Sequence, residues 1–327
     1  MIDLFRATPL RALFEAHPLR MIDIGARGGL DADLHPAAWA IDAVGFEPEP
    51  EAHAALEAGA SGPWRSQRHL PVAIAGGTGS RMLHVPPDPA SASLLAHDPA
   101  FGERFAMPHM FGPLREIPVD TMTLDGAARR FAIGPVHHLK LDVEGAELEI
   151  LQAAPEVLGD VVSIKLEAAF LPFRKGQPLA WDVAGWLHER GFELTDILGP
   201  ARWRTGPLAP HPFMARAPAG YSRGQIAQCD LLFFRGRDHL RDAEDRLAAF
   251  LSAASHGYFD LAASVLAGEE RALVERRFGL DLTAATGATA KCYGRRAVKG
   301  ALVRHLRDLI PAIRSLLGGV PAPKGRA

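Results

Sequence analysis

The sequence predicts an α/β fold with a mainly parallel sheet, closed at one edge by an antiparallel pair of strands and followed by a helical extension. Short apolar runs alternate with helical stretches from residue 20 to about 236, which is typical of parallel sheets. A glycine-rich turn, "GARGG", follows the first apolar run. Two late runs, "FELTDIL" and "CDLLFFR", have no clear helix between them, which indicates the antiparallel pair.

The individual elements follow from apolar runs, helical periodicity and stop signals. Gly191, for example, stands where a helix stop is preferred. The seven expected strands cover residues 20–24, 42–47, 70–75, 137–143, 161–167, 192–197 and 229–235. The helices expected within this region cover residues 50–58, 121–131, 147–154 and 180–190.

Changes in composition divide the chain into three parts. We expect an N-terminal helical extension over 1–19, the α/β domain over 20–237 and a helical region over 238–327. The last part ends in "PAPKGRA", which is expected to be disordered. Within the α/β domain, residues 76–118 are rich in Gly, Pro and Ser and too long for a simple connection, so they predict a functional insertion or lid.

Composition and charge narrow the class of protein. The chain has 327 residues, of which 48% are hydrophobic and 23% are charged, as in ordinary soluble proteins. A net charge of −2 argues against nucleic acid as the main partner. Two cysteines make neither a disulfide framework nor a zinc site, so we expect a cytoplasmic protein. No uninterrupted apolar run approaches the roughly 18 residues of a transmembrane helix.

The glycine-rich turn and the acids near it indicate a nucleotide site. Asp23 lies at the end of the first strand, Gly25 follows, and Glu47 lies 22 residues beyond Gly25 at the end of the second strand. Glycines let backbone approach a ligand closely, and an acid at this distance accepts hydrogen bonds from ribose hydroxyls. The alternative is a tight turn without a ligand, with Glu47 as a solvated strand end.

The spacing within the turn favours one nucleotide over another. A pyrophosphate fingerprint reads G-x-G-x-x-G, which this turn does not match, and Asp23 would repel phosphate. The same acid suits a ligand with a cationic amino group, such as S-adenosylmethionine. Arg27 is expected to point outward or to bind the carboxylate of that ligand. An oxidoreductase that uses NAD on the same architecture is the rival enzyme.

Charged residues occupy two strands that would normally be apolar on both faces. Lys140 and Asp142 share one face of the strand 137–143, and Glu144 continues the series. Lys165 and Glu167 repeat the arrangement on the next strand. Because unpaired buried charges are unfavourable, we expect these groups to pair across the two strands. Their acids would then lie at the ligand-binding edge of the sheet, unless the cluster is purely architectural.

Three stretches of the sequence resemble the FkbM family of S-adenosylmethionine-dependent methyltransferases. They are "IDIGARGG", "GFEPEP" and "LKLDVEGAELEILQAA", and the last is the most specific. The resemblance covers roughly residues 20–235. It implies a Rossmann-like class I methyltransferase fold and methyl transfer to a hydroxyl of a sugar, polyketide or related small molecule or glycan. A scaffold without catalytic activity is a further alternative.

The resemblance also implies roles for individual residues. Glu47 would hold the ribose of S-adenosyl-L-methionine, and the cofactor loop would consist of Asp23, Gly25, Ala26, Arg27 and Gly29. Asp142 and Glu144 would lie near the methyl group and the acceptor. As the base for the hydroxyl proton, Asp142 is the first candidate, followed by Glu144 and Glu167. We expect no metal, although three acids near one cleft are also the ligands that Mg²⁺ prefers.

A basic amphipathic helix is expected over residues 295–318. Apolar residues recur near one of its faces, and arginines lie elsewhere. Such a stripe usually packs in a core or forms a contact between subunits, so we expect packing or a homo-oligomer. Peripheral contact with a membrane surface is the alternative.

Overall fold

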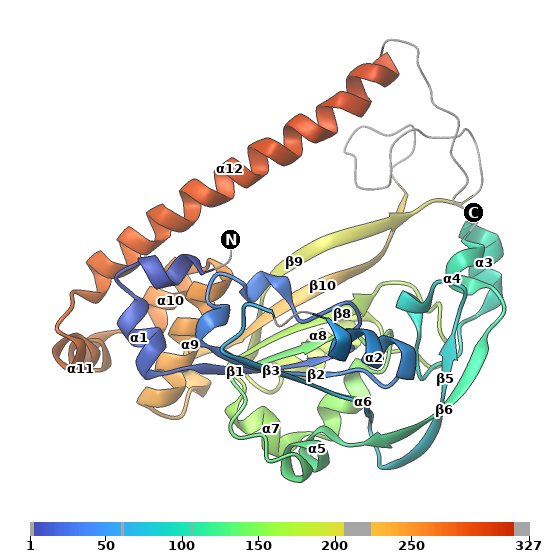
Figure 1. Cartoon of the computed structure of the whole chain (residues 1–327), viewed down its shortest axis with the longest axis horizontal. Coiled ribbons are helices and arrows are strands. Elements are labelled where there is room, and N and C mark those ends of the chain that lie inside the picture. The colour runs from blue at the N-terminus through green and yellow to red at the C-terminus, as the bar shows by residue number, and fades with distance from the viewer. Residues whose placement is uncertain (1–2, 60–61, 106, 206–223, 317–327) are drawn as a thin grey trace.

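A seven-stranded sheet forms the centre of the protein in a computed structural model, which describes residues 3–59, 62–105, 107–205 and 224–316 (Figure 1). In spatial order its strands are β3 (Ser66–Leu70), β2 (Ile41–Phe46), β1 (Leu19–Ile24), β7 (His138–Leu141), β8 (Ser163–Ala169), β10 (Gln225–Arg235) and β9 (Phe192–Trp203). The tail 321–327, for which disorder is predicted, lies outside the described residues.

The strand directions confirm the fold class predicted from the sequence. β3, β2, β1, β7 and β8 pair in parallel, whereas β10 is antiparallel to both β8 and β9. The spatial order of the strands reverses between β1 and β7: β2 and β3 lie on one side of β1, and β7 and β8 lie on its other side. Open α/β sheets bind ligands outside the carboxyl ends of the strands at such a switch point. Those ends are the residues that follow Ile24, Phe46 and Leu141.

Each face of the sheet is buried under its own set of helices. Alternate residues of β1 show the division: Met21 packs into one core and Ile22 into the other. The core that contains Met21 includes the N-terminal helix and the first helices of the C-terminal region, whereas the opposite core includes the helices between β6 and β9 (Figure 1). The terminal helices therefore pack on the same sheet as the rest of the chain.

The helices begin and end at local signals in the sequence. α9 begins after Asp242, whose side chain accepts a hydrogen bond from Asp245 N, and ends at Gly257 in the left-handed conformation. The helices and 3₁₀ turns are η1 (Leu4–Ala7), α1 (Arg11–Ala16), η2 (Ala32–Leu34), η3 (Ala38–Ala40), α2 (Pro50–Ala58), η4 (Pro89–Ser91), α3 (Pro99–Phe105), α4 (Pro108–Phe111), α5 (Leu124–Arg130), α6 (Glu147–Gln152), α7 (Pro155–Asp160), α8 (Ala180–His188), η5 (Arg237–His239), α9 (Ala243–His256), α10 (Phe259–Val265), α11 (Gly268–Phe278) and α12 (Leu282–Leu316).

Residues 70–118 differ from the expectation. The predicted strand 70–75 is misplaced: β3 ends at Leu70, and Pro71, which has no N–H to donate to a ladder, follows it. The next residues of the predicted insertion enter a separate three-stranded sheet. That sheet consists of β4 (Ala73–Ile74), β6 (Arg115–Met122) and β5 (Gly79–Val85), with α3 and α4 between β5 and β6. It stands beside the carboxyl ends of the main strands (Figure 1).

The long last helix, α12, leaves the body of the protein (Figure 1). Its first turns are docked, because Leu282 and Thr289 are buried. Further along, Leu302 is 59% exposed. The stripe that the sequence analysis expected to pack is therefore not covered by this chain in the part that the structure describes. The domain boundaries near residues 20 and 238 remain predictions.

Candidate active site

The turn after β1 needs glycine because it passes against the end of β7. Gly25 has φ +86°, and a Cβ atom at this position would lie only 1.9 Å from the backbone oxygen of Asp142. Hydrogen bonds hold the turn there: Asp142 N donates to Ile24 O, and the N–H groups of Gly25 and Ala26 both donate to Phe46 O. The close approach joins the ends of β1, β2 and β7 into one surface.

Glu47 follows β2 and faces the same surface. It is 4% exposed, and its Oε1 accepts a hydrogen bond of 2.9 Å from Glu49 N. Burial raises the pKa of the Glu47 carboxyl, and this N–H bond opposes the rise. One oxygen is thus fixed, and Oε2 lies 3.9 Å from Arg27 Nε.

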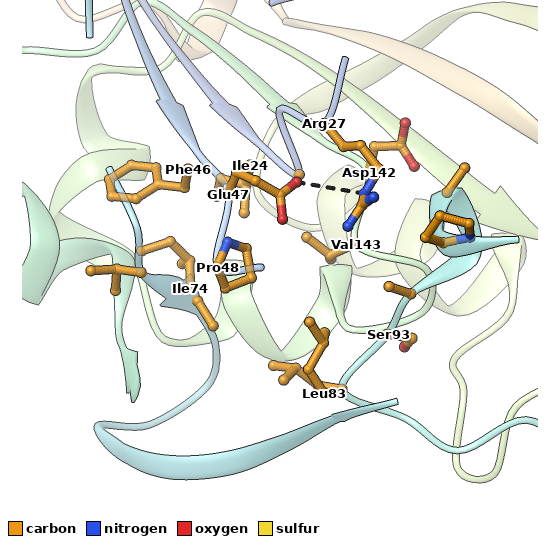
Figure 2. A pocket seen from close by; sticks show the side chains of 17 residues that line it. Ile24, Arg27, Phe46, Glu47, Pro48, Ile74, Leu83, Ser93, Asp142 and Val143 are labelled. Atoms are coloured by element: carbon orange, nitrogen blue, oxygen red, sulfur yellow. Dashed lines mark ion pairs between the residues drawn. The ribbon is translucent and has the colours of Figure 1, made fainter. Parts of the chain in front are cut away.

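Arg27 turns toward acids of this chain (Figure 2). Its expected contact with the carboxylate of a ligand stays a prediction. Arg27 Nη2 lies 2.8 Å from Glu49 Oε2, and Arg115 Nη2 lies 2.7 Å from the other oxygen of Glu49. Glu49 is 2% exposed, so two arginines neutralise a buried carboxylate at the start of α2.

A pocket opens at this surface, between the ends of β1, β2 and β7 and the small sheet (Figure 2). Its polar groups are the side chains of Arg27, Glu47, Ser93 and Asp142. Its walls are otherwise apolar or backbone, supplied by Ile24, Gly25, Phe46, Pro48, Val72, Ala73, Ile74, Leu83, Pro89, Ala90, Ala92, Leu94 and Val143. Mostly apolar walls with a few convergent polar groups are typical of small-molecule sites.

Asp23 lies behind this pocket and not in its wall. It is fully buried, its Oδ2 accepts a hydrogen bond from Asp31 N, and its Oδ1 lies 3.1 Å from Lys140 Nζ. Burial raises the pKa of Asp23 to about 6, although Lys140 opposes the rise. Burial alone would lower the pKa of Lys140, but Asp23 and Asp142 outweigh it and raise that pKa. The pair is therefore charged at neutral pH.

The predicted pairing of charges between β7 and β8 is wrong, because the register places lysine opposite lysine. Lys140 pairs with Lys165 in the ladder. Each lysine finds its acids elsewhere: Lys140 in Asp23 and Asp142, and Lys165 in the three aspartates Asp31, Asp33 and Asp230, at 3.2, 2.6 and 3.6 Å. The end of β1 and the loop after it therefore supply acids to both lysines.

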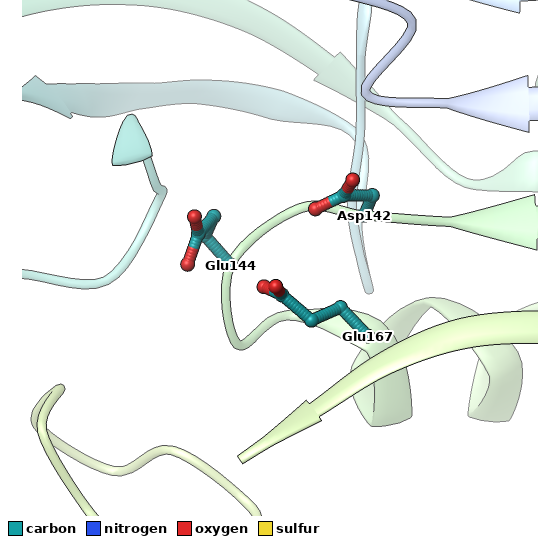
Figure 3. A group of neighbouring side chains, drawn as sticks. All are labelled: Asp142, Glu144 and Glu167. Atoms are coloured by element: carbon teal, nitrogen blue, oxygen red, sulfur yellow. The ribbon is translucent and has the colours of Figure 1, made fainter. Parts of the chain in front are cut away.

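Three carboxylates meet beside the pocket. The oxygens of Asp142, Glu144 and Glu167 lie within 4.8 Å of one another (Figure 3). Arg174 approaches this group from the segment after β8: it is 4% exposed, and its Nη2 lies 2.6 Å from Glu144 Oε2. Gln228 Nε2 donates to Glu167 at 2.6 Å. The oxygens are spaced closely enough to bind a cation, but the buried guanidinium of Arg174 already forms an ion pair with Glu144.

The three carboxyls differ in their surroundings. Burial raises the pKa of Glu144, and Arg174 opposes the rise. Burial and the charges of Glu144 and Asp142 hold the pKa of Glu167 well above its usual range. Asp142 is the most open of the three, with 41% of its side chain exposed. Of the three, only Asp142 lines the pocket.

A tight turn between β7 and α6 places these acids. Glu144 has φ +59°, which is uncommon for a residue with a side chain, and Gly145 follows with φ +113°. Glu147 at the start of α6 closes the turn, because its carboxyl accepts hydrogen bonds from Val143 N and Gly145 N. Ser93 Oγ donates to the backbone oxygen of Glu144 at 2.8 Å. Strained backbone with such support is a feature of functional sites.

The structure thus separates the residues singled out in the sequence. Gly25, Arg27, Glu47 and Asp142 line one pocket. The others lie outside its wall: Asp23 and Ala26 are buried behind it, Gly29 lines a neighbouring cavity, and Glu144 and Glu167 adjoin Asp142.

Sequence reasoning missed Arg174 and Glu147. Arg174 is the more informative of the two, and an arginine inside the apolar segment "FLPFRKG" was the available signal.

Comparison with known proteins agrees with this geometry. Residues 23–194, just over half of the chain, match a family model described as Methyltransferase FkbM domain. The match begins at Asp23 and includes the glycine turn, Glu47 and the three carboxylates. No curated protein matches the chain significantly.

Proposed function

The chain belongs to the FkbM methyltransferase family, and from this premise we propose that it transfers the methyl group of S-adenosylmethionine to a hydroxyl of a small molecule. A sugar, polyketide or related metabolite is the proposed acceptor. The observation that carries the proposal is the pocket where Gly25, Glu47 and Asp142 come together. These residues come from the ends of three adjacent strands at the switch point of the sheet.

The residues of the pocket fit such a cofactor. The tight turn at Gly25 places backbone in the pocket wall beside the end of β7, and the remaining oxygen of Glu47 can accept hydrogen bonds from ribose hydroxyls. The apolar side chains of Val72, Ile74 and Leu83 offer a surface for a purine ring. The carboxylates of Glu47 and Asp142, with Arg27 already paired to Glu49, suit a positively charged sulfonium better than a pyrophosphate.

Asp142 is the residue that we assign as the base. When bound, S-adenosylmethionine supplies a methyl group whose bond to sulfur breaks, with the electron pair left on sulfur, as the acceptor oxygen bonds to the methyl carbon. Asp142 accepts the proton that the hydroxyl releases, because its carboxylate reaches the pocket and stays near Lys140. Glu144 is held by Arg174, and neither Glu144 nor Glu167 lines the pocket.

Cofactor binding is tested by calorimetry on Glu47→Ala. Loss of hydrogen bonds to a charged group costs about 1.5–3 kcal/mol each, so we expect affinity for S-adenosylmethionine to fall at least about tenfold. Glu189→Ala, which removes an exposed glutamate, is the control and should bind like the wild type. Tighter binding of NAD than of S-adenosylmethionine would support the oxidoreductase, and binding of neither would support a scaffold.

Methyl transfer itself is tested with labelled cofactor and a panel of sugar and polyketide acceptors. Asp142→Asn should reduce turnover by about 10²-fold or more while cofactor binding stays measurable, since positioned bases contribute about this much. Full activity of this variant would remove Asp142 from the role of base. We expect turnover to persist in EDTA, because Arg174 already serves the carboxylate cluster; a loss that Mg²⁺ restores would assign the cluster to a metal.

A further inference from the structure

The outer part of α12, residues 295–316, which we call the arm, carries an uncovered apolar stripe. Val298, Leu302, Leu306 and Leu309 are 69%, 59%, 54% and 50% exposed. At about 100° of turn per residue these four side chains lie within roughly 80° of one another, so they form one continuous stripe. Isolated exposed apolar residues are normal, but a stripe along a projecting helix indicates an interaction surface.

The arm also belongs to a strongly basic part of the chain. Residues 282–327 contain nine Lys and Arg and one Asp, a formal net charge of +8. The remaining residues contain 27 Lys and Arg and 37 Asp and Glu, a net charge of −10. The overall charge of −2 hides this contrast. The exposed bases of the arm itself include Arg295, Arg296 and Lys299.

We propose that the arm lies on the surface of an anionic lipid membrane. In this arrangement the stripe enters the boundary between headgroups and acyl chains, while the bases meet lipid phosphates and carboxylates. The docked first turns of α12, where Leu282 and Thr289 are buried, connect this surface to the sheet that carries the pocket. No helix in the described part of the chain is long and apolar enough to cross a membrane.

Both features together favour a membrane over other partners. Nucleic acid would bind the Lys and Arg side chains of the arm but would leave the apolar stripe exposed to water. A second copy would cover the stripe but would bring two basic helices side by side, and like charges repel. An anionic bilayer accommodates the apolar stripe and the positive charge at the same time. This inference concerns a surface remote from the pocket and does not depend on the proposed chemistry.

The test is co-sedimentation of the full chain with vesicles. Binding to phosphatidylcholine mixed with phosphatidylserine should be at least tenfold tighter than binding to phosphatidylcholine alone, and it should weaken in high salt. Leu302→Glu/Leu306→Glu should weaken it at least tenfold. Leu194→Glu/Ile197→Glu is the matched control, because these side chains are 47% and 48% exposed on β9, and it should bind like the wild type.

Three results would overturn the proposal. The first is equal binding by the two double variants, with thermal unfolding confirming that both are folded. The second is a stable dimer without lipid that Leu302→Glu/Leu306→Glu converts to monomer, which would identify a second copy as the partner. The third is tighter binding to duplex DNA than to the mixed vesicles.

Discussion

The pocket edge of the sheet and the arm of α12 differ in how their cationic side chains are buried and paired. At the edge, Lys140 and Lys165 are mostly buried, and each has two or three carboxylates within 3.6 Å. On the arm, bases such as Arg296 are exposed beside uncovered Val and Leu side chains. The charges of the two edge lysines are neutralised by acids of this chain, so substitutions there should lower the stability of the fold. The exposed side chains of the arm are not covered by other residues of this chain, so substitutions there should affect binding to a partner.

The largest expected effect follows when the buried ion pair between Lys140 and Asp23 is broken. Lys140→Met leaves Asp23 fully buried without its cation, and removal of one partner from such a pair costs about 3–5 kcal/mol. Arg129→Met is the control, because its pair with Glu156 is 63% and 67% exposed and should contribute less than about 1 kcal/mol. Urea unfolding measures both. Equal losses would show that burial does not distinguish the two pairs.

The next effect concerns the glycine turn. Gly25→Ala forces a Cβ into the backbone of Asp142 at a positive φ, so we expect a loss of about 3 kcal/mol. Gly28→Ala has a similar φ of +80° but nothing within 4 Å of its Cβ, so only the backbone cost of about 1 kcal/mol should remain. The difference in unfolding free energy isolates the close approach. It should vanish if the turn does not touch β7 in solution.

A smaller effect depends on pH. Burial raises the pKa of Glu147 to about 7, so between its ordinary pKa and about 7 the folded chain holds a proton that the unfolded chain has released. Stability should therefore fall by about 2–3 kcal/mol as pH rises through this window. Glu147→Gln should flatten the fall, measured as unfolding free energy at about pH 5 and about pH 8. Glu149→Gln, on the same helix, is the control and should keep the wild-type slope.

The smallest effect is expected on the arm. Leu302→Ala should change the unfolding free energy by less than about 0.5 kcal/mol, as is usual for exposed positions. Leu251→Ala, the same change at a fully buried position of α9, should cost about 2–5 kcal/mol. Differential scanning calorimetry compares the two. A large loss at Leu302 would mean that the stripe is covered within the chain after all.

Much of the fold was predictable because it depends on local patterns. Alternating apolar runs identified six of the seven strands, because the predicted strand 70–75 overlaps β3 only at Leu70. The absence of a helix between the last two identified the antiparallel edge. The register was not predictable, because the pattern of β7 and β8 is the same whether Lys140 faces Glu167 or Lys165. The small sheet was missed for a related reason: its strands pair across a long Gly- and Pro-rich segment whose composition indicates a loop.

The site was predictable where it follows strand ends and not where it depends on distant segments. Gly25, Glu47 and Asp142 come directly after or near the ends of predicted strands, so their meeting follows from the parallel sheet. Arg174 reaches Glu144 from 30 residues further along the chain, and Arg115 reaches Glu49 from the small sheet.

The turn closed by Glu147 has a consequence for engineering. Its two backbone hydrogen bonds and the unusual φ of Glu144 fix where both neighbouring acids stand, so the segment 142–147 offers little freedom to a designer. The wall formed by residues 89–94 faces the same pocket and touches that turn through a single serine hydroxyl bond. Under the proposed function, attempts to change the acceptor would therefore begin with randomised libraries in that wall.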